Sequence, residues 1–180
     1  NRDPTVDGIM IQMPIANSKE LISLIDPKKD VDGLREDSPY LPAAAKAVMK
    51  ILTTSAFGTP SYIGGGRGVV CVVGSTGMVG KALMKQLASL PVGQLISMHK
   101  SNFDPEKLKI ADIIISATGV QNLINEQIIK PGAICIDVGY PHGDFSPSTA
   151  LRAGFITPVP GGVGPVTVVC LFENLIHAIK

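Results

Sequence analysis

The chain has 180 residues, enough for one domain or slightly more, and 45% of them are hydrophobic, so a sizeable core can be buried. Charged residues make up 17% and the formal net charge is +1, which argues against a nucleic-acid tract or a polybasic membrane patch. The apolar runs are shorter than the about 20 residues of a membrane helix. The three cysteines lie in apolar runs without a CxxC pair, as expected of reduced thiols in the cytoplasm.

The first third of the chain is a series of short apolar runs separated by polar turns. DGIMIQMPI, at residues 7–15, predicts a short strand that ends at Pro14. A helix is expected next, with Leu and Ile at helical spacing, Ser18 as its N-cap and a proline as its stop. Another helix is expected over residues 43–52, opened by Pro42.

The polar turn KKDVDG brings two carboxylates, Asp30 and Asp32, close together. Such a pair could bind a metal, bind an amine-bearing ring, or cap a turn. No further ligands stand near, and the histidines and cysteines show no metal spacing, so the residues favour no metal site.

From residue 68 onward, strands alternate with helical segments. Strands are expected at 68–74, 94–100, 111–119, 132–140 and 154–160, and helical segments at 78–90, 125–130 and 166–180. This alternation predicts right-handed βαβ units and an α/β, Rossmann-like, doubly wound parallel sheet. The preceding GGGRG run comes before a strand and lacks a following Lys-Ser or Lys-Thr, so it is interpreted as a loop and not as a phosphate site.

Three glycines follow the first strand of this sheet at the spacing G-x-x-G-x-x-G. Glycines let backbone N–H groups approach a phosphate, and the start of the next helix adds partial positive charge. The alternative is a tight strand-to-helix turn without a ligand. We predict a dinucleotide site whose residues in this turn are Gly74, Ser75, Thr76, Gly77, Met78, Val79 and Gly80.

The end of the second strand indicates which dinucleotide is bound. NAD enzymes often carry an acidic residue there for the ribose 2′-hydroxyl, whereas this strand ends in MHKSN. Lys100 and Ser101 could hold a 2′-phosphate, which favours NADP over NAD; the alternative for Lys100 is a solvated surface lysine. Beyond the turn, the predicted cofactor residues are His99, Lys100, Ser101, Ala117, Thr118, Gly119, Asp137, Val138, Gly139 and Thr167.

Five separated stretches together resemble one family. They are DGIMIQMPI, DPKKDVDGL, VVGSTGMVGKAL, IKPGAICIDVGY and ITPVPGGVGPVTV. In this order they resemble the bifunctional methylenetetrahydrofolate dehydrogenase/methenyltetrahydrofolate cyclohydrolase family along essentially the whole chain. The resemblance implies NAD(P)-dependent oxidation of 5,10-methylenetetrahydrofolate and hydrolysis of the methenyl product to 10-formyltetrahydrofolate. It also implies a homodimer, with tetrahydrofolate derivatives as the substrates.

The resemblance also assigns roles to residues outside the glycine turn. Gln12 looks like the polar residue that supports the family's catalytic lysine, Pro14 like a wall of the folate pocket, and Asp32 like the carboxylate that binds the amino-pterin edge. Gln12 and Asp32 are the expected catalytic residues. The stiff loop before the last helix resembles the one that contacts folate and nicotinamide, through Gly161, Gly162, Gly164 and Pro165, with Pro165 expected to start the helix.

The family's Tyr-x-x-x-Lys motif has no counterpart here, because the three tyrosines are followed four residues later by Ala44, Gly66 and Asp144. We therefore expect a fragment with negligible cyclohydrolase activity. Residues 1–38 are predicted to be the remnant of an α/β folate domain, 39–160 the Rossmann-like domain, and 161–180 a loop and helix that return to the first domain. The alternatives are a dehydrogenase for another substrate and an inactive dinucleotide-binding or dimerisation module.

Overall fold

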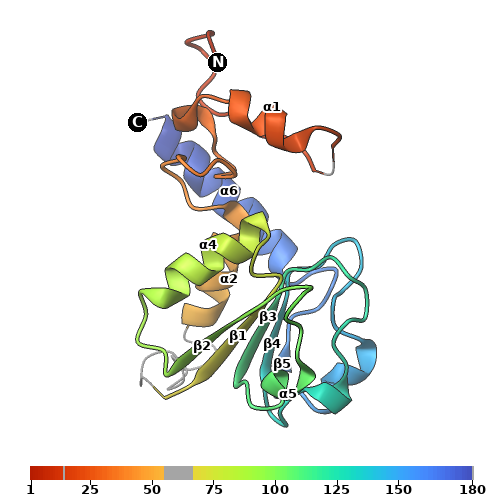
Figure 1. The fold of residues 1–180 in the computed structure, drawn as a ribbon. Helices are drawn as coiled ribbons and strands as arrows, with labels where there is room; N and C mark the ends of the chain where they lie inside the picture. Colours follow the sequence, from red (N-terminus) through yellow and green to blue (C-terminus); the bar gives the residue numbers. More distant parts are fainter. Residues whose placement is uncertain (14, 55–66, 180) are drawn as a thin grey trace.

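Five parallel strands form the centre of the molecule in the computed structural model, which describes residues 1–13, 15–54 and 67–179 (Figure 1). The sheet has the order β2-β1-β3-β4-β5. The strands are β1 (Val69–Val73), β2 (Gln94–Met98), β3 (Ile113–Ser116), β4 (Ile134–Asp137) and β5 (Phe155–Ile156). The predicted parallel α/β sheet is therefore confirmed.

The register of the sheet gathers the strand ends at one edge. Val73 pairs with Met98 on one side and with Ser116 on the other, and Ser116 pairs with Asp137. These are the last residues of β1 to β4, so the segments that follow four different strands begin side by side. A ligand at this edge can contact all of them at once.

Alternate residues of each strand face two different core layers. Val70, Val72 and Ile113 pack with α2 (Ala43–Thr53), α4 (Met78–Ala88) and α6 (Val163–Ala178). Cys71 and Ile114 face a second cluster, covered by α5 (Pro105–Leu108) and η3 (Glu126–Ile128), and η4 (Pro147–Leu151) packs beside η3. The sheet is thus buried on both faces, by long helices on one and by short turns on the other.

The three cysteines lie in these core layers. Cys71, Cys135 and Cys170 are buried and unpaired, as the sequence predicts. Burial raises the pKa of Cys71 and of Cys135 to about 12, which keeps both thiols protonated and unreactive at neutral pH.

Of the short helical elements in the second layer, η3 lies within the helical segment expected at 125–130, whereas α5 and η4 were not expected from the sequence. In α5 the side chain of Asp104 accepts a hydrogen bond from the Glu106 N–H, and η3 has the same arrangement between Asn125 and Gln127. These caps stabilise segments that are too short to show an apolar period. The last helix starts at Val163, so Pro165 is its third residue and not its first. A proline is tolerated there because the first four amides of a helix have no partner within it.

The N-terminal segment differs most from the prediction. The strand expected over residues 7–15 is wrong in the described part: Ile9 forms a single bridge with Asp30, and no neighbouring strand continues the pairing. Pro14 lies outside the described residues, as do Gly64 to Gly66 of the GGGRG run. Helix α1 (Ser18–Leu24) is present, but its N-cap is Asn17 in a left-handed conformation, which asparagine tolerates better than serine.

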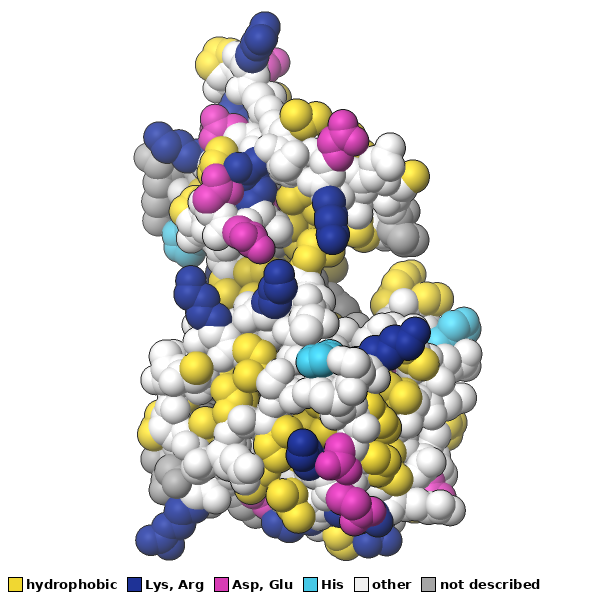
Figure 2. Space-filling view, in the orientation of Figure 1, with side chains coloured by type: hydrophobic (Ala, Val, Ile, Leu, Met, Phe, Trp, Pro, Cys, Tyr) yellow, Lys and Arg dark blue, Asp and Glu magenta, His cyan; other side chains and the backbone are white. Residues whose placement is uncertain are grey.

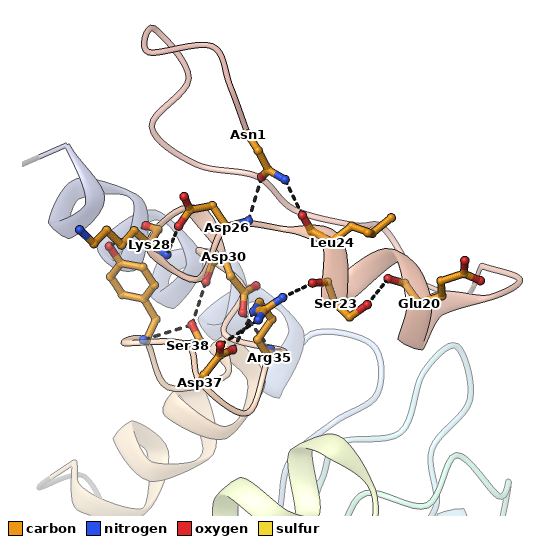
Figure 3. A network of polar contacts seen from close by, with 11 residues as sticks. Asn1, Glu20, Ser23, Leu24, Asp26, Lys28, Asp30, Arg35, Asp37 and Ser38 are labelled. Carbon is orange, nitrogen blue, oxygen red and sulfur yellow. Dashed lines mark hydrogen bonds and ion pairs between the residues drawn. The ribbon is translucent and has the colours of Figure 1, made fainter.

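A polar network holds α1 to the turn that follows it (Figure 3). Asn1 accepts a hydrogen bond from the Asp26 N–H and donates one to the Leu24 carbonyl, next to the 3₁₀ turn η1 (Pro27–Lys29). Arg35 donates to the Ser23 carbonyl and forms a two-point ion pair with Asp37. Most of these contacts are exposed, so each adds little to stability.

Helix α6 joins the N-terminal segment to the sheet (Figure 1). The Asn174 amide, which is buried, donates to the carbonyls of Val31 and Leu41, and its oxygen accepts from Lys46 Nζ. Near Gly8, α6 packs closely: a Cβ there would lie 2.7 Å from a Leu175 methyl carbon, so that side chain would have to move. The first residues of the chain and the last turn of α6 lie at this end of the molecule, away from the sheet (Figure 1).

No helix in the described part of the chain is long and apolar enough to cross a membrane. Among the same residues, no three His, Cys, Asp or Glu side chains are grouped so that they could hold a metal ion.

Candidate functional site

The turn between β1 and α4 depends on two of its three glycines for packing. Gly74 has φ +85°, and a Cβ there would lie 2.4 Å from the Ala117 carbonyl oxygen. A Cβ on Gly80 would lie 2.1 Å from the Gly74 carbonyl oxygen, so only glycine lets α4 approach the turn this closely. Gly77 is different: its Cβ would meet that oxygen at an ordinary 3.4 Å.

Gly77 is the N-cap of α4 and makes no side-chain cap hydrogen bond. The first amides of a helix have no partner within the helix, and the helix dipole is positive at this end. A ligand oxygen can therefore take the place that a serine or aspartate cap would occupy. This arrangement suits a phosphate group of a dinucleotide.

A groove of about 620 Å³ lies at the carboxyl ends of β1, β2 and β3. Seven residues predicted from the sequence line it: Gly74, Thr76, Gly77, His99, Lys100, Ala117 and Thr118. Phe103, Val120 and Leu123, which the prediction did not include, form apolar walls. They are apolar residues shortly after strand ends, and that position is the signal that could have identified them.

Ser75 is turned away from this groove. Its backbone N–H and its hydroxyl both donate to the Met98 carbonyl, at 3.1 and 3.0 Å, and its oxygen accepts from the Ser97 hydroxyl at 2.9 Å. Ser75 is 5% exposed. These bonds tie the end of β1 to the end of β2, and a cofactor contact by Ser75 remains a prediction.

The end of β2 presents a cation at the groove. Lys100 is exposed and has no ion-pair partner in the part of the chain that the structure describes. The Ser101 hydroxyl is 3.0 Å from His99 Nδ1, and the Asn102 side chain accepts from the His99 N–H at 2.6 Å. These short-range bonds fix the turn and leave the lysine ammonium group available to an anion.

Asp137, after β4, is buried behind the groove. Its carboxylate accepts backbone N–H bonds from Gly139, Asp144 and Phe145 at 2.8 to 3.1 Å. Burial raises the pKa of Asp137, while these three N–H bonds act in the opposite direction. The contacts indicate a loop-closing role, and cofactor binding by Asp137, Val138 or Gly139 remains a prediction. Gly119 follows Thr118 with φ +67°.

The loop before α6 has two unusual backbone features. Val159–Pro160 is a cis peptide bond and Gly161 has φ +102°. A Cβ on Gly162 would lie 2.4 Å from the Pro158 carbonyl oxygen, whereas open space surrounds Gly161 and Gly164. Thr167 donates its hydroxyl to the Val163 carbonyl at 2.9 Å. None of these residues lines the 620 Å³ groove.

The other predicted residues lie in the N-terminal segment. Asp32 is half-buried, and burial, with a smaller contribution from the nearby Asp30, raises its pKa to about 6. Gly33 after it has φ +71° and fits against the backbone of Leu41. Gln12 is exposed, and its amide donates only a long, 3.4 Å bond to the neighbouring Met13 carbonyl. No hydrogen bond joins Gln12 to Asp32 among the described residues.

A second hollow, of about 860 Å³, lies between the N-terminal segment and the sheet domain. Figure 2 shows a notch between these parts and charged side chains of both signs over the N-terminal part. The hollow runs from α1 and residues 33–37 to the first turn of α4. Thr76 and Gly77 line both this hollow and the groove, so two ligands could meet at the glycine turn.

The fold and the groove define a dinucleotide-binding α/β protein. Comparison with known proteins is more specific: residues 42–180 match the model of the tetrahydrofolate dehydrogenase/cyclohydrolase NAD(P)-binding domain. The bifunctional protein FolD of Clostridium tetani is 34% identical over 199 aligned positions, which cover 100% of this chain and 69% of that protein. The chain belongs to the tetrahydrofolate dehydrogenase/cyclohydrolase family.

Solved structures agree with this assignment. The methylenetetrahydrofolate dehydrogenase-cyclohydrolase of Trypanosoma brucei, complexed with NADP and an inhibitor, has a TM-score of 0.84 and 30% identity and matches 100% of this chain and 69% of its own. A methylenetetrahydrofolate dehydrogenase from the silkworm Bombyx mori has the same TM-score and 32% identity, matching 99% of this chain and 69% of its own.

Proposed function

We propose that the 620 Å³ groove binds NADP and that the chain acts in one-carbon folate metabolism as a methylenetetrahydrofolate dehydrogenase/cyclohydrolase. The observation that carries the proposal is that one groove collects three strand ends, an uncapped helix N-terminus and Lys100, which has no ion-pair partner among the described residues. The first amides of α4 hold the pyrophosphate, and Lys100 and Ser101 hold the 2′-phosphate. NADP supplies the hydride acceptor for the oxidation of the one-carbon bridge.

The folate occupies the second hollow in this proposal. Gly33, directly after Asp32, lines that hollow, and Thr76 and Gly77 connect it to the cofactor groove. The Asp32 carboxylate, part-buried, accepts hydrogen bonds from the amino-pterin edge, with Gln12, Pro14 and the Gly161–Pro165 loop completing the substrate site. Residues 1–38 act as the folate part and residues 39–160 as the cofactor part, with α6 linking them.

The 180-residue chain hydrolyses methenyltetrahydrofolate negligibly, since no lysine follows a tyrosine by four residues to polarise the one-carbon centre. The alternative is an inactive dinucleotide-binding or dimerisation module. A spectrophotometric assay of NADP reduction by methylenetetrahydrofolate separates the two, because the inactive module binds NADP without reducing it. We also propose a homodimer in the cytoplasm, which gel filtration with light scattering and cell fractionation would test.

The cofactor assignment is tested by titrating NADP and NAD into the wild type and Lys100→Gln by calorimetry. Loss of the charge should weaken NADP binding about five- to tenfold and leave NAD binding within about twofold, because only NADP carries the 2′-phosphate. Lys85→Gln, an exposed lysine on α4 outside the groove, is the matched control and should change neither affinity. Equal losses for NADP and NAD would contradict the assigned role of Lys100, and a wild type that binds neither would refute the cofactor site.

A further inference from the structure

Asp144 lies behind the wall of the cofactor groove and is fully buried. It belongs to the connection between β4 and β5, and its side chain reaches back to the end of β3. Its Oδ2 atom accepts three hydrogen bonds: from Ser116 Oγ at 2.7 Å, from the Thr118 N–H at 2.7 Å and from Thr118 Oγ1 at 2.8 Å. Bonds to a carboxylate are stronger than those between neutral groups, so this contact holds Thr118 firmly.

The other oxygen of Asp144 reduces the stability of the folded protein. Oδ1 has no hydrogen-bond partner among the described residues, although it is buried. The carboxylate of Asp137 is close by and accepts the Asp144 N–H at 3.1 Å, so two acidic groups share one buried region. An unpaired buried carboxylate oxygen beside a second carboxylate lowers stability. Fold stability alone therefore does not account for an aspartate at this position.

Thr118 connects Asp144 to the groove. It lines the groove with Ala117, whose carbonyl oxygen is so close to Gly74 that no Cβ would fit between them. Thr118 Oγ1 also accepts the Val120 N–H at 3.1 Å, and Val120 forms another part of the wall. A shift at Asp144 would thus move Thr118 and Val120 in the groove wall. Both lie close to the place where the Ala117 carbonyl packs tightly against Gly74 of the glycine turn.

We infer that Asp144 is a positioning residue for the cofactor: it holds Thr118, and through it Val120, in the arrangement that dinucleotide binding requires. This inference rests on the proposed cofactor site. Asp144 itself does not line the groove, so its effect on the ligand passes through Thr118. An oxygen acceptor at the position of Oδ2 is what holds Thr118, and the negative charge strengthens its bonds, so asparagine should keep the arrangement with weaker bonds.

The test compares NADP dissociation constants of three variants of the full chain by calorimetry. Asp144→Asn keeps an oxygen at the Oδ2 position and should bind NADP within about threefold of the wild type. Asp144→Leu has a similar volume but no acceptor and should bind about tenfold or more weakly. Phe145→Leu alters the adjacent buried residue, which is outside the groove, and should bind like the wild type. Circular dichroism establishes that each variant is folded.

If Asp144 acts by positioning Thr118, Asp144→Asn should bind NADP much more tightly than Asp144→Leu. A general loss of structure would instead weaken NADP binding in both Asp144→Leu and Phe145→Leu. Equal NADP affinity of the leucine and asparagine variants would overturn the inference, as would equal weakening by Phe145→Leu. If Asp144→Leu does not fold, Thr118→Val replaces it, with Thr118→Ser as the variant that keeps the hydroxyl; equal affinity of these two would also overturn it. Failure of the wild type to bind NADP would refute the proposed cofactor site instead.

Discussion

The glycine turn and the N-terminal segment are held in place in different ways. The turn sits on strands β1 and β3, whose residues are almost all buried, and it is bonded to β2 through its own backbone and the Ser75 hydroxyl. The segment before residue 42 is fixed to the rest mainly by α6, more than 120 residues away, through the Asn174 side chain and the close contact at Gly8. Its other polar contacts are mostly local and exposed.

Because of this difference, the two proposed ligand sites should differ in how easily they are disturbed. The cofactor groove belongs to the cooperative core, where one misplaced atom is costly because packing is dense. The folate hollow lies between that core and a more loosely attached segment, so it can open while the core stays folded. Variants in the turn should damage both regions, whereas variants at the α6 contact should affect the N-terminal segment first.

The largest effect is expected for Gly80→Ala. The new Cβ would lie 2.1 Å from the Gly74 carbonyl oxygen, which is backbone and cannot rotate away, so α4 must shift. We expect a loss of about 3 kcal/mol in the free energy of unfolding, measured by urea denaturation, together with loss of NADP binding. Gly77→Ala is the control for folding, since its Cβ has an ordinary contact distance and its φ of −71° suits alanine. Equal stability of Gly80→Ala and the wild type would show that the turn is less tightly packed than described.

A smaller and more local effect is expected for Asn174→Leu. The carbonyls of Val31 and Leu41 lose their buried donor and Lys46 loses one of its two partners. We expect a loss of about 2 kcal/mol that is confined to the N-terminal segment, seen as faster limited proteolysis before residue 42 with unchanged NADP binding. Ile176→Ala, an exposed position on the same helix, should not change the cleavage rate. A loss of NADP affinity in Asn174→Leu would mean that the two regions are not separable.

The same difference explains what could be predicted from the sequence. The strands of the sheet, α2 and α4 were predictable because their apolar pattern and flanking glycines are local signals. The strand expected at residues 7–15 was not formed in the described part because a strand needs a partner along its length, and among the described residues of that range only Ile9 finds one, in Asp30. Ser75 shows a similar limit at the site: its hydroxyl bonds to Ser97 and Met98 of another strand, which its position in the turn did not predict, and a cofactor contact by Ser75 stays a prediction.

The smallest effect is expected for Asp32→Asn, which tests the N-terminal segment through the pH dependence of stability. The folded-state pKa of Asp32 is raised to about 6 from 3.8, so the folded state holds a proton between these values that the unfolded state has lost. Stability therefore falls as the pH rises from about 4 to about 6, and the full cost of the buried charge is present above pH 6.

Asparagine carries no charge, so the variant should be more stable than the wild type by about 1 to 2 kcal/mol at pH 7.5, allowing for partial exposure, with no difference near pH 4. Thermal melts of both proteins across this range measure the difference. A constant difference at all pH values would show that packing, and not the charge, sets the contribution of Asp32, and would remove the physical basis for a carboxylate poised to bind an amine-bearing ring.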